Sequence, residues 1–324
     1  MTRSQLWNRR EWLWRSGGGL GGIALAALRL RENASGSEGL HFPARAKRVI
    51  QLFMAGGASH VDLFDYKPRL IRDHGKPWDP GEKVELFQST PGRTLKSPWP
   101  WKRYGDSGTW LNEVVAPLGS VVDEIAFLHT MVSSSAVHSQ ATLLATTGFP
   151  TPGFPGAGAW VSYALGSMND DLPTFVVLPD RRGFASNGAK NWVAGFLPAS
   201  HAGTLLRVGR PEPMADLHAP RDSFVTATAD AEGRRLLERL NRHHAARHED
   251  DGQLEARIRS YELAARMQLS APEAFDISQE PEYILKSYGI QKGQPVYPAE
   301  INEREETDYF GTKCLIARRL LERG

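Results

Sequence analysis

The chain has 324 residues, of which 41% are hydrophobic and 23% are charged, so its composition is that of a globular protein and excludes the disordered and fibrous classes. A single cysteine, Cys314, excludes an intramolecular disulfide and a metal site built from cysteines. Residues 1–31 hold six arginines and one acid, leaving 33 bases against 36 acids, so the rest of the chain gives no electrostatic reason to expect a nucleic-acid partner.

Residues 1–31 have the pattern of an export signal. Arg9 and Arg10 precede a bulky apolar pair, and Gly17–Leu28 is uncharged and rich in glycine, alanine and leucine. This order is typical of a twin-arginine signal, so we expect the twin-arginine export machinery as a partner and a periplasmic or extracellular location. The alternative is an amphipathic helix, which three consecutive glycines would weaken. We expect no transmembrane span after signal removal, because an apolar run of roughly 12 residues is too short to cross a bilayer.

The remaining chain divides into a polar linker over residues 32–47 and a folded domain over residues 48–324. Apolar spacing in the domain predicts strands and helices in alternation. In chain order these are a strand at Arg48–Met54, a helix at Trp110–Val122, a strand at Ile125–Leu128, helices at Gln140–Thr147 and Ala157–Leu165, and a strand at Thr174–Pro179. This alternation predicts an α/β fold, a parallel central sheet with helices on both faces.

The C-terminal third is predicted to be a helical segment. From Ala229 onward, leucines and other large apolar residues keep helical spacing along a charged surface. They are Leu236, Leu237, Leu240, Leu254, Ile258, Tyr261 and Met267. A last helix is predicted from about Gly311 to Arg323.

The first candidate cluster follows the first predicted strand. His60, Asp62 and Asp65 come directly after a glycine-rich turn, and ligands of open α/β sheets bind beyond the carboxyl ends of strands. Carboxylate and imidazole groups together suit a divalent metal, so these three residues are candidate ligands. The alternative is a polar turn in which Ser59 and Asp62 cap the next helix.

The second candidate cluster follows the second predicted strand. His129 ends that strand, and His138 and Ser139 follow it at the start of a predicted helix. A serine hydroxyl at a helix N-terminus lies near the positive end of the dipole, which favours an anionic substrate group. The alternative is that His129 only finishes a strand and Ser139 only caps a helix. Two clusters at successive strand ends favour one shared site.

Two further features have simpler interpretations. His244 and His248 are one helical turn apart, as metal-ligand pairs can be, but their charged surroundings favour a solvated helix face. Cys314 falls within the last predicted helix and is interpreted as a buried structural cysteine.

Several stretches, in the same order along nearly the whole chain, resemble a known family. That family comprises twin-arginine-exported, sulfatase-like proteins of uncharacterised activity within the alkaline phosphatase superfamily. The stretches are Arg9–Leu13, Phe53–Asp62, Lys102–Gly108, His129–His138, Ala159–Gly166, Gly195–Thr204, Arg257–Ala264 and Phe310–Arg319.

The resemblance implies an exported hydrolase with an alkaline-phosphatase-like fold that cleaves phosphate or sulfate esters with a divalent metal (zinc, magnesium, manganese or calcium). By position, Asp62 would be a metal ligand with His60 beside it, and Asp65 and His129 complete our metal-ligand set. His138 and Ser139 would fall near the nucleophile-bearing helix start and are the expected catalytic residues. Family members continue beyond a segment like 317–324, so we expect a domain incomplete at its C-terminus. The alternatives are a non-catalytic exported binding protein of the same fold, or an inactive fragment.

Overall fold

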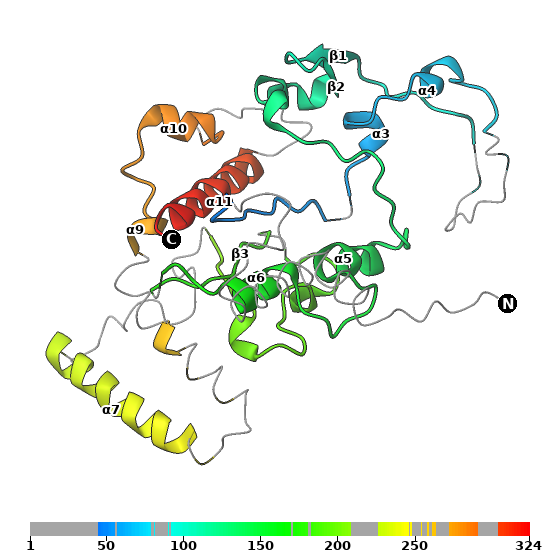
Figure 1. Cartoon of the computed structure of the whole chain (residues 1–324). Helices are drawn as coiled ribbons and strands as arrows, with labels where there is room; N and C mark the ends of the chain where they lie inside the picture. Colours follow the sequence, from blue (N-terminus) through cyan, green and yellow to red (C-terminus); the bar gives the residue numbers. More distant parts are fainter. Residues whose placement is uncertain are drawn as a thin grey trace, which may run out of the picture. The chain divides into compact units, whose positions relative to one another are not determined.

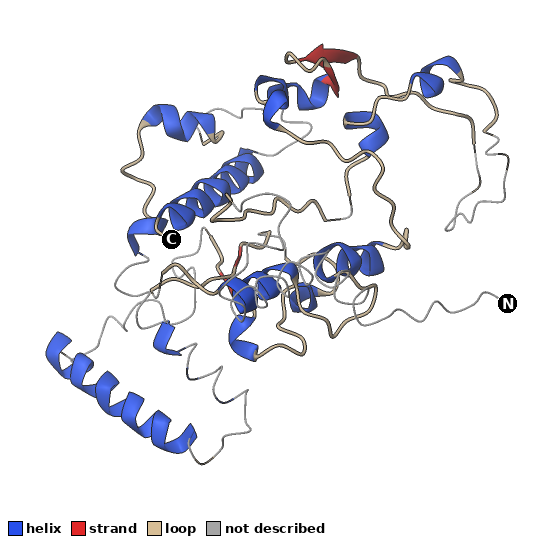
Figure 2. Ribbon diagram, in the orientation of Figure 1, coloured by secondary structure: helices blue, strands red, loops and turns tan. Residues whose placement is uncertain are grey.

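The computed structural model of the chain describes residues 45–55, 57–78, 81, 90, 92–169, 171–180, 183–208, 226–245, 247, 254, 258, 261–263, 272–290 and 304–324. The predicted export signal and the predicted linker before residue 45 lie outside these residues. The described chain mixes helices with short strands, and much of it is loop (Figures 1 and 2). It forms two compact units, one of residues 53–141 and one of residues 1–52 and 142–324.

The elements are, in chain order, α3 (His60–Leu63), α4 (Pro68–Arg72), β1 (Trp101–Tyr104), β2 (Thr109–Asn112), the 3₁₀ helices η2 (Glu113–Ser120) and η3 (Val122–Glu124), α5 (His138–Thr147), α6 (Ala157–Leu165), β3 (Val176–Val177), the 3₁₀ helices η4 (Gly188–Asn191) and η5 (Ala199–His201), β4 (Thr204–Leu205), α7 (Ala227–Ala245), α9 (Pro272–Phe275), α10 (Glu282–Ser287) and α11 (Arg304–Glu322). Strands β1 and β2 pair antiparallel, whereas β3 and β4 pair parallel.

An antiparallel hairpin organises the unit of residues 53–141. Trp101 pairs with Asn112 and Tyr104 with Thr109 across β1 and β2. The ring of Tyr66 stacks on Trp110 of the hairpin, with 4.3 Å between the ring centroids. Leu111 beside it is fully buried, so this hairpin holds part of the small apolar core of the unit.

The turn of this hairpin is fixed by a carboxylate. Asp123 accepts hydrogen bonds from the backbone N–H of Asp106 (2.8 Å) and of Ser107 (2.9 Å). The Ser107 hydroxyl and these two backbone groups lower the pKa of Asp123. Gly105 in the same turn has a φ of 67°, and a Cβ there would collide with the side chains of Asp123 and Val122. The turn therefore requires glycine at this position.

The other unit has a conventional apolar core. Buried side chains from four separate segments pack together in it, and they are Leu172, Leu206, Val208, Ala274, Ile316 and Leu320. Val176 of β3 flanks this core, Leu206 directly follows β4, and α11 packs against α9. The C-terminal helix therefore contributes one wall of this core.

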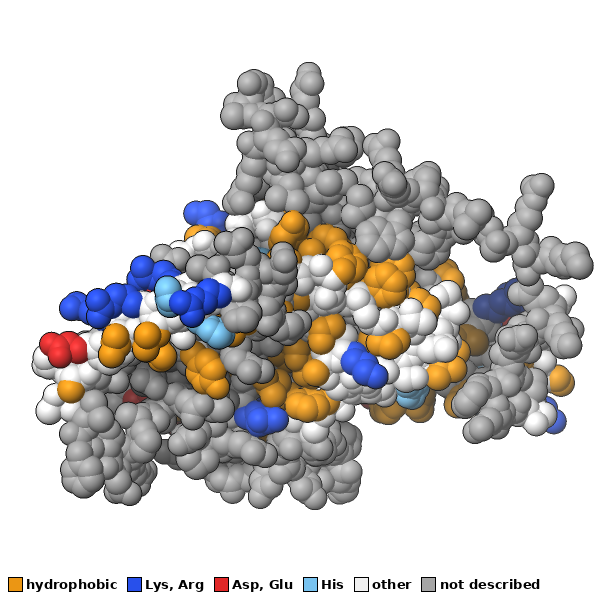
Figure 3. All heavy atoms as spheres, turned by 90° about the horizontal axis from the view of Figure 1, so that it is seen from below, with side chains coloured by type: hydrophobic (Ala, Val, Ile, Leu, Met, Phe, Trp, Pro, Cys, Tyr) orange, Lys and Arg blue, Asp and Glu red, His pale blue; other side chains and the backbone are white. Residues whose placement is uncertain are grey.

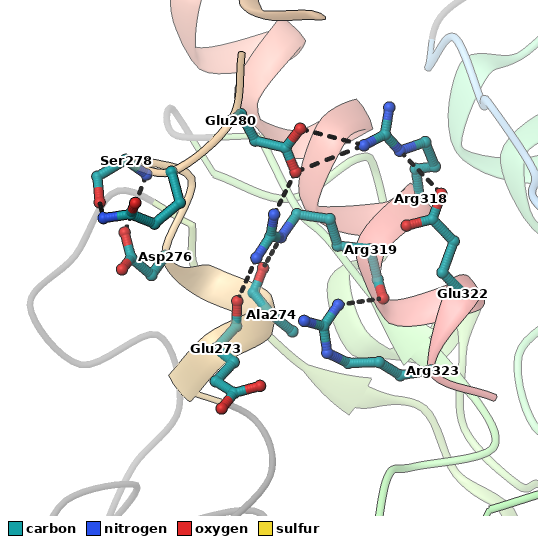
Figure 4. Close-up of polar contacts among 10 residues, drawn as sticks. Glu273, Ala274, Asp276, Ser278, Glu280, Arg318, Arg319, Glu322 and Arg323 are labelled. Carbon is teal, nitrogen blue, oxygen red and sulfur yellow. Dashed lines mark hydrogen bonds and ion pairs between the residues drawn. The ribbon is translucent and has the colours of Figure 1, made fainter.

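A buried ion pair fastens α11 to the segment before α10. Arg319 pairs with Glu280, whose side chain is only 9% exposed. The Nε of Arg319 also donates a hydrogen bond to the carbonyl of Ala274 at 3.1 Å. Arg318 reaches the same carboxylate at 3.4 Å (Figure 4). Because Glu280 has two arginine partners, its buried charge is well compensated.

Three predicted helices are present, one with the predicted bounds and two that begin earlier than predicted. The helix α6 has the predicted bounds Ala157–Leu165, and α5 begins two residues before the predicted Gln140. The helix α11 begins at Arg304, before the predicted Gly311, and ends at Glu322. Cys314 within it is half-buried, and burial raises the pKa of its thiol.

The prediction of a helix at Trp110–Val122 was wrong. Its first residues form β2, because Trp101–Tyr104 offers a partner strand, and the rest forms the 3₁₀ helix η2. Asn112 starts that helix by accepting a hydrogen bond from the N–H of Val114 at 2.9 Å. Pro117 lies inside η2 and lacks the N–H that a regular helix would use there.

Among the described residues, the predicted parallel central sheet is represented only by the two-residue strands β3 and β4. Of the predicted strand Thr174–Pro179, only Val176–Val177 is paired. Arg48–Met54 and Ile125–Leu128 are not strands, and Val49, Leu52 and Leu128 are largely exposed. A strand requires a partner for its backbone groups, and no backbone hydrogen bond within the described part of the chain joins residues 48–53 to another segment.

Candidate functional site

Asp62 lies in a short polar turn. It belongs to the four-residue helix α3, and its Oδ2 accepts a hydrogen bond from the hydroxyl of Ser59 at 2.6 Å. Its backbone N–H donates to the carbonyl of Ser59 at 3.1 Å. This geometry suits the polar-turn alternative, although the Ser59 hydroxyl donates to Asp62 and does not cap the helix.

The backbone of Asp62 is held from a distant segment. The hydroxyl of Ser97 donates to the carbonyl of Asp62 at 3.2 Å, and Asn112 donates to that hydroxyl at 3.1 Å. Ser97 and Asn112 are both buried. This polar chain therefore positions the segment that carries the candidate residues.

Asp65 and His129 are brought together from segments that are 64 residues apart. Oδ1 of Asp65 lies 3.7 Å from Nδ1 of His129, which is an ion-pair distance. The side chain of Asp65 is 12% exposed and that of His129 is 44% exposed. The ring of His129 lies parallel to that of Phe127, with 5.8 Å between centroids. A sheltered carboxylate thus faces one nitrogen of an accessible imidazole.

Lys67 binds the other oxygen of the same carboxylate. Its Nζ lies 2.6 Å from Oδ2 of Asp65, so Asp65 has a cationic group on one oxygen and an imidazole on the other. Sequence reasoning did not include Lys67, and its position two residues after Asp65 was the only available signal. Nothing in the sequence near Ser97 or Asn112 indicated that they hold the backbone of Asp62.

His60 enters the cluster through its backbone. Its carbonyl accepts a hydrogen bond from the N–H of Asp65 at 2.8 Å, while its side chain is exposed on α3. The carbonyl of His60 therefore helps to fix the position of the Asp65 backbone, and the imidazole of His60 lies on the surface of the unit.

His138 and Ser139 occupy the first turn of α5. His138 is exposed and Ser139 is half-buried. The hydroxyl of Ser135 orders the approach to this helix, because it accepts from the N–H of Val137 at 3.2 Å and donates to Gln140 at 2.9 Å. The positive end of a helix dipole is therefore close to Ser139 in sequence and space.

The residues of the expected metal centre are only partly gathered. Asp65 and His129 supply two donor atoms, and their 3.7 Å separation suits two ligands of one ion. No group of three or more His, Cys, Asp or Glu side chains in the described ranges could hold a metal ion. Since protein sites usually supply three or more donors, the described residues alone do not complete such a centre.

No helix among the described residues is both long enough and apolar enough to cross a membrane. Of the two surface histidines noted in the sequence, His244 is exposed on α7, and His248 lies outside the described residues.

Comparison with known proteins corrects the resemblance drawn from the sequence. A search of curated proteins and a search of solved structures each gave no match. Residues 46–324 match the family described as protein of unknown function (DUF1501), which is distinct from the sulfatase and alkaline phosphatase families, and neither of those families matches. The sulfatase-like assignment was therefore wrong, because short stretches in a shared order were given the weight of a family-wide pattern. The chain belongs to the DUF1501 family.

Proposed function

We propose that this protein is an exported hydrolase of phosphate or sulfate esters whose reacting centre contains Asp65 and His129. The observation that carries the proposal is the contact between the sheltered carboxylate of Asp65 and Nδ1 of the accessible His129. A carboxylate in this position orients an imidazole and stabilises its protonated form.

In this proposal His129 is the general base. With Nδ1 held toward Asp65, Nε2 is the nitrogen that takes a proton from the attacking water or hydroxyl. Lys67 places a positive charge 2.6 Å from the second oxygen of Asp65, which leaves Oδ1 to face the imidazole. The pair therefore places a carboxylate beside the imidazole that is proposed as the base.

Ser139 is proposed to meet the anionic part of the substrate. It lies in the first turn of the ten-residue helix α5, where backbone N–H groups and the dipole favour a phosphate or sulfate group. His138 beside it is the second candidate for proton transfer. A divalent metal, when bound, would polarise the ester oxygen, and Asp65 and His129 are the two described donors that could reach it, with Asp62 and His60 as further candidates.

The test is hydrolysis of para-nitrophenyl phosphate and para-nitrophenyl sulfate by the full chain, with and without added zinc, magnesium, manganese or calcium. Replacing His129 with Ala should lower kcat by about 10²–10⁴-fold, which is the usual contribution of a general base. His74→Ala removes an exposed imidazole of the same unit and should leave kcat unchanged. No turnover of either ester under any metal condition would reject the proposal.

The second candidate is a non-catalytic exported binding protein. The observation that favours it is that the described residues gather only two of the donors expected for a metal centre. Saturable binding of phosphate or sulfate, measured by calorimetry, without hydrolysis of either ester would support binding over catalysis.

Export is proposed through Arg9 and Arg10, which lie outside the described residues. Replacing both with lysine should trap a reporter fusion in the cytoplasm, because the machinery reads the arginine pair. Unchanged delivery to the periplasm or medium would reject the twin-arginine assignment.

A larger parallel sheet, covered by helices on both faces, is also part of the proposal, with β3 and β4 as its described strands. Its support is the parallel pairing of Val176–Val177 with Thr204–Leu205, because parallel strands occur almost only in sheets that are covered on both faces. Circular dichroism of the purified chain should then give more strand than the four described strands provide.

A further inference from the structure

A serine and a histidine are joined by a hydrogen bond in the unit of residues 1–52 and 142–324. The hydroxyl of Ser162 lies 2.9 Å from Nδ1 of His201. Ser162 belongs to α6, and His201 is the last residue of the 3₁₀ helix η5. Asp65 and His129 belong to the other unit, so this pair is distinct from the centre proposed for phosphate and sulfate esters.

The hydroxyl of Ser162 is directed away from its own helix. A serine or threonine inside a helix commonly donates to the carbonyl one turn earlier, as Thr147 of α5 does to Leu143 at 2.8 Å. Within the described part of the chain, the hydroxyl of Ser162 bonds instead to the imidazole of His201. In the tautomer that carries its proton on Nε2, Nδ1 of that imidazole accepts the hydroxyl proton. The serine therefore faces a base.

The imidazole of His201 is held through its ring and its backbone. The ring of Tyr163 meets it edge to face, with 5.4 Å between the centroids and an angle of 87° between the planes. The N–H of His201 donates to the carbonyl of Pro198 at 3.0 Å, and the N–H of Gly203 donates to the carbonyl of Trp192 at 2.9 Å. A nucleophile within hydrogen-bond reach of a base, with a third group orienting that base, is the arrangement that activates a serine.

The surroundings of the pair are sheltered and apolar. Ser162 is only 6% exposed, and His201 is half-buried. Tyr163 and Leu165 of the same helix are 38% and 53% exposed. Hydrophobic side chains of this kind gather near the centre of Figure 3. A sheltered hydroxyl with apolar neighbours favours a small neutral substrate, because an ion would lose its hydration there.

We propose that Ser162 and His201 form a second reactive site, which cleaves small carboxylic esters such as acetyl esters. Nδ1 of His201 takes the proton of the Ser162 hydroxyl while Oγ bonds to the acyl carbon. The imidazolium gives this proton to the leaving alcohol as the bond between the acyl carbon and the alcohol oxygen breaks. Water then attacks the acyl carbon and gives a proton to Nδ1, which returns it to Oγ as the carboxylic acid leaves.

The test is labelling of the folded full chain with diisopropyl fluorophosphate, followed by mass spectrometry of its peptides. The label should map to Ser162, because this reagent reacts with a serine hydroxyl that a neighbouring base activates. His201→Gln should slow labelling about 10²–10⁴-fold, which is the usual contribution of a general base. Ser162→Ala should remove both the label and the burst of para-nitrophenol from para-nitrophenyl acetate.

Matched controls separate the pair from other serines and histidines of the same unit. Ser167→Ala removes an exposed hydroxyl shortly after α6, and His244→Ala removes an exposed imidazole of α7. Both variants should be labelled as fast as the parent chain. The parent chain unfolded in urea should not be labelled, because the hydrogen bond to His201 requires the fold. This comparison needs no variant, so it decides the test even if His201→Gln fails to fold.

Three outcomes would overturn the proposal. They are no labelled serine in the folded chain, as a purely structural hydrogen bond predicts, a label on Ser139 or another serine but not on Ser162, and equal labelling rates for the parent and a folded His201→Gln variant. Turnover of phosphate or sulfate esters is not read at any step, so the result is independent of the proposed hydrolase.

Discussion

The two units are stabilised in different ways. The unit of residues 53–141 depends on polar contacts, such as those of Asp123 with the hairpin turn and of Asn112 with Ser97. The other unit packs an apolar core around Leu206 and closes it with the ion pair of Arg319 and Glu280. The candidate pair Asp65–His129 lies in the polar unit. A proton-transferring pair needs a base that solvent and substrate can reach, and in this unit the sheltered Asp65 faces the accessible His129.

The largest expected effect is at the ion pair of the apolar unit. Arg319→Ala leaves the carboxylate of Glu280 buried with a weaker partner, and should lower the free energy of unfolding by about 3–5 kcal/mol. Chemical denaturation monitored by circular dichroism measures this loss of unfolding free energy. The control Arg242→Ala breaks an exposed pair on α7 and should cost under about 0.5 kcal/mol. Equal losses would contradict the distinction between buried and surface pairs.

The next effect concerns the apolar core itself. Leu206 is fully buried, so Leu206→Ala should lower the free energy of unfolding by about 3 kcal/mol through lost burial and a cavity. Leu236→Ala alters an exposed leucine and should cost under about 0.5 kcal/mol. Similar midpoints of denaturation for the two variants would mean that Leu206 is not part of a packed core.

A smaller effect is expected in the polar unit. Gly105→Ala should cost about 2 kcal/mol, because a positive φ disfavours alanine and the new Cβ meets Asp123 and Val122. Gly75 has a φ of 79° with open space around it, so Gly75→Ala carries the backbone cost alone and should cost about 1 kcal/mol. Thermal unfolding of both variants separates the backbone cost of a positive φ from the cost of the Cβ collision at Gly105. A larger loss for Gly75→Ala would contradict the described turn.

The smallest effect is a dependence on pH. Hydrogen bonds lower the pKa of Asp123 in the folded state, so its stabilising contribution is complete above the unfolded value of about 3.9 and declines as the pH falls through the folded value. Unfolding midpoints between pH 6 and the acid limit, compared with those of Asp123→Asn, should converge as the pH falls. A difference that grows toward low pH would contradict this sign.

Prediction from the sequence succeeded where apolar spacing alone decides the structure. The helix α6 has four buried residues, including Ala159 and Trp160, and its bounds were predicted to the residue. The same spacing misled at Trp110–Val122, because a partner strand and the cap of Asn112 outweighed it. Local periodicity contains no information about which distant segment is available for pairing.

The candidate site was predicted in part for the same reason. The sequence named both Asp65 and His129, which the structure brings to ion-pair distance. It could not indicate that Asp65 also binds Lys67, or that Asp62 instead accepts from Ser59, because these choices depend on side-chain geometry within a turn. For His138 and Ser139 the sequence indicated a helix start, and α5 begins there.

The central claim is that Asp65 and His129 act as one unit in ester hydrolysis, and a double-mutant cycle on kcat tests it most directly. Asp65→Asn, His129→Ala and the double variant are compared with the parent chain on the better of the two para-nitrophenyl esters. The account predicts that the double variant is no slower than the slower single variant, since either change removes the same proton transfer. Losses that multiply, or single variants as fast as the parent, would contradict it.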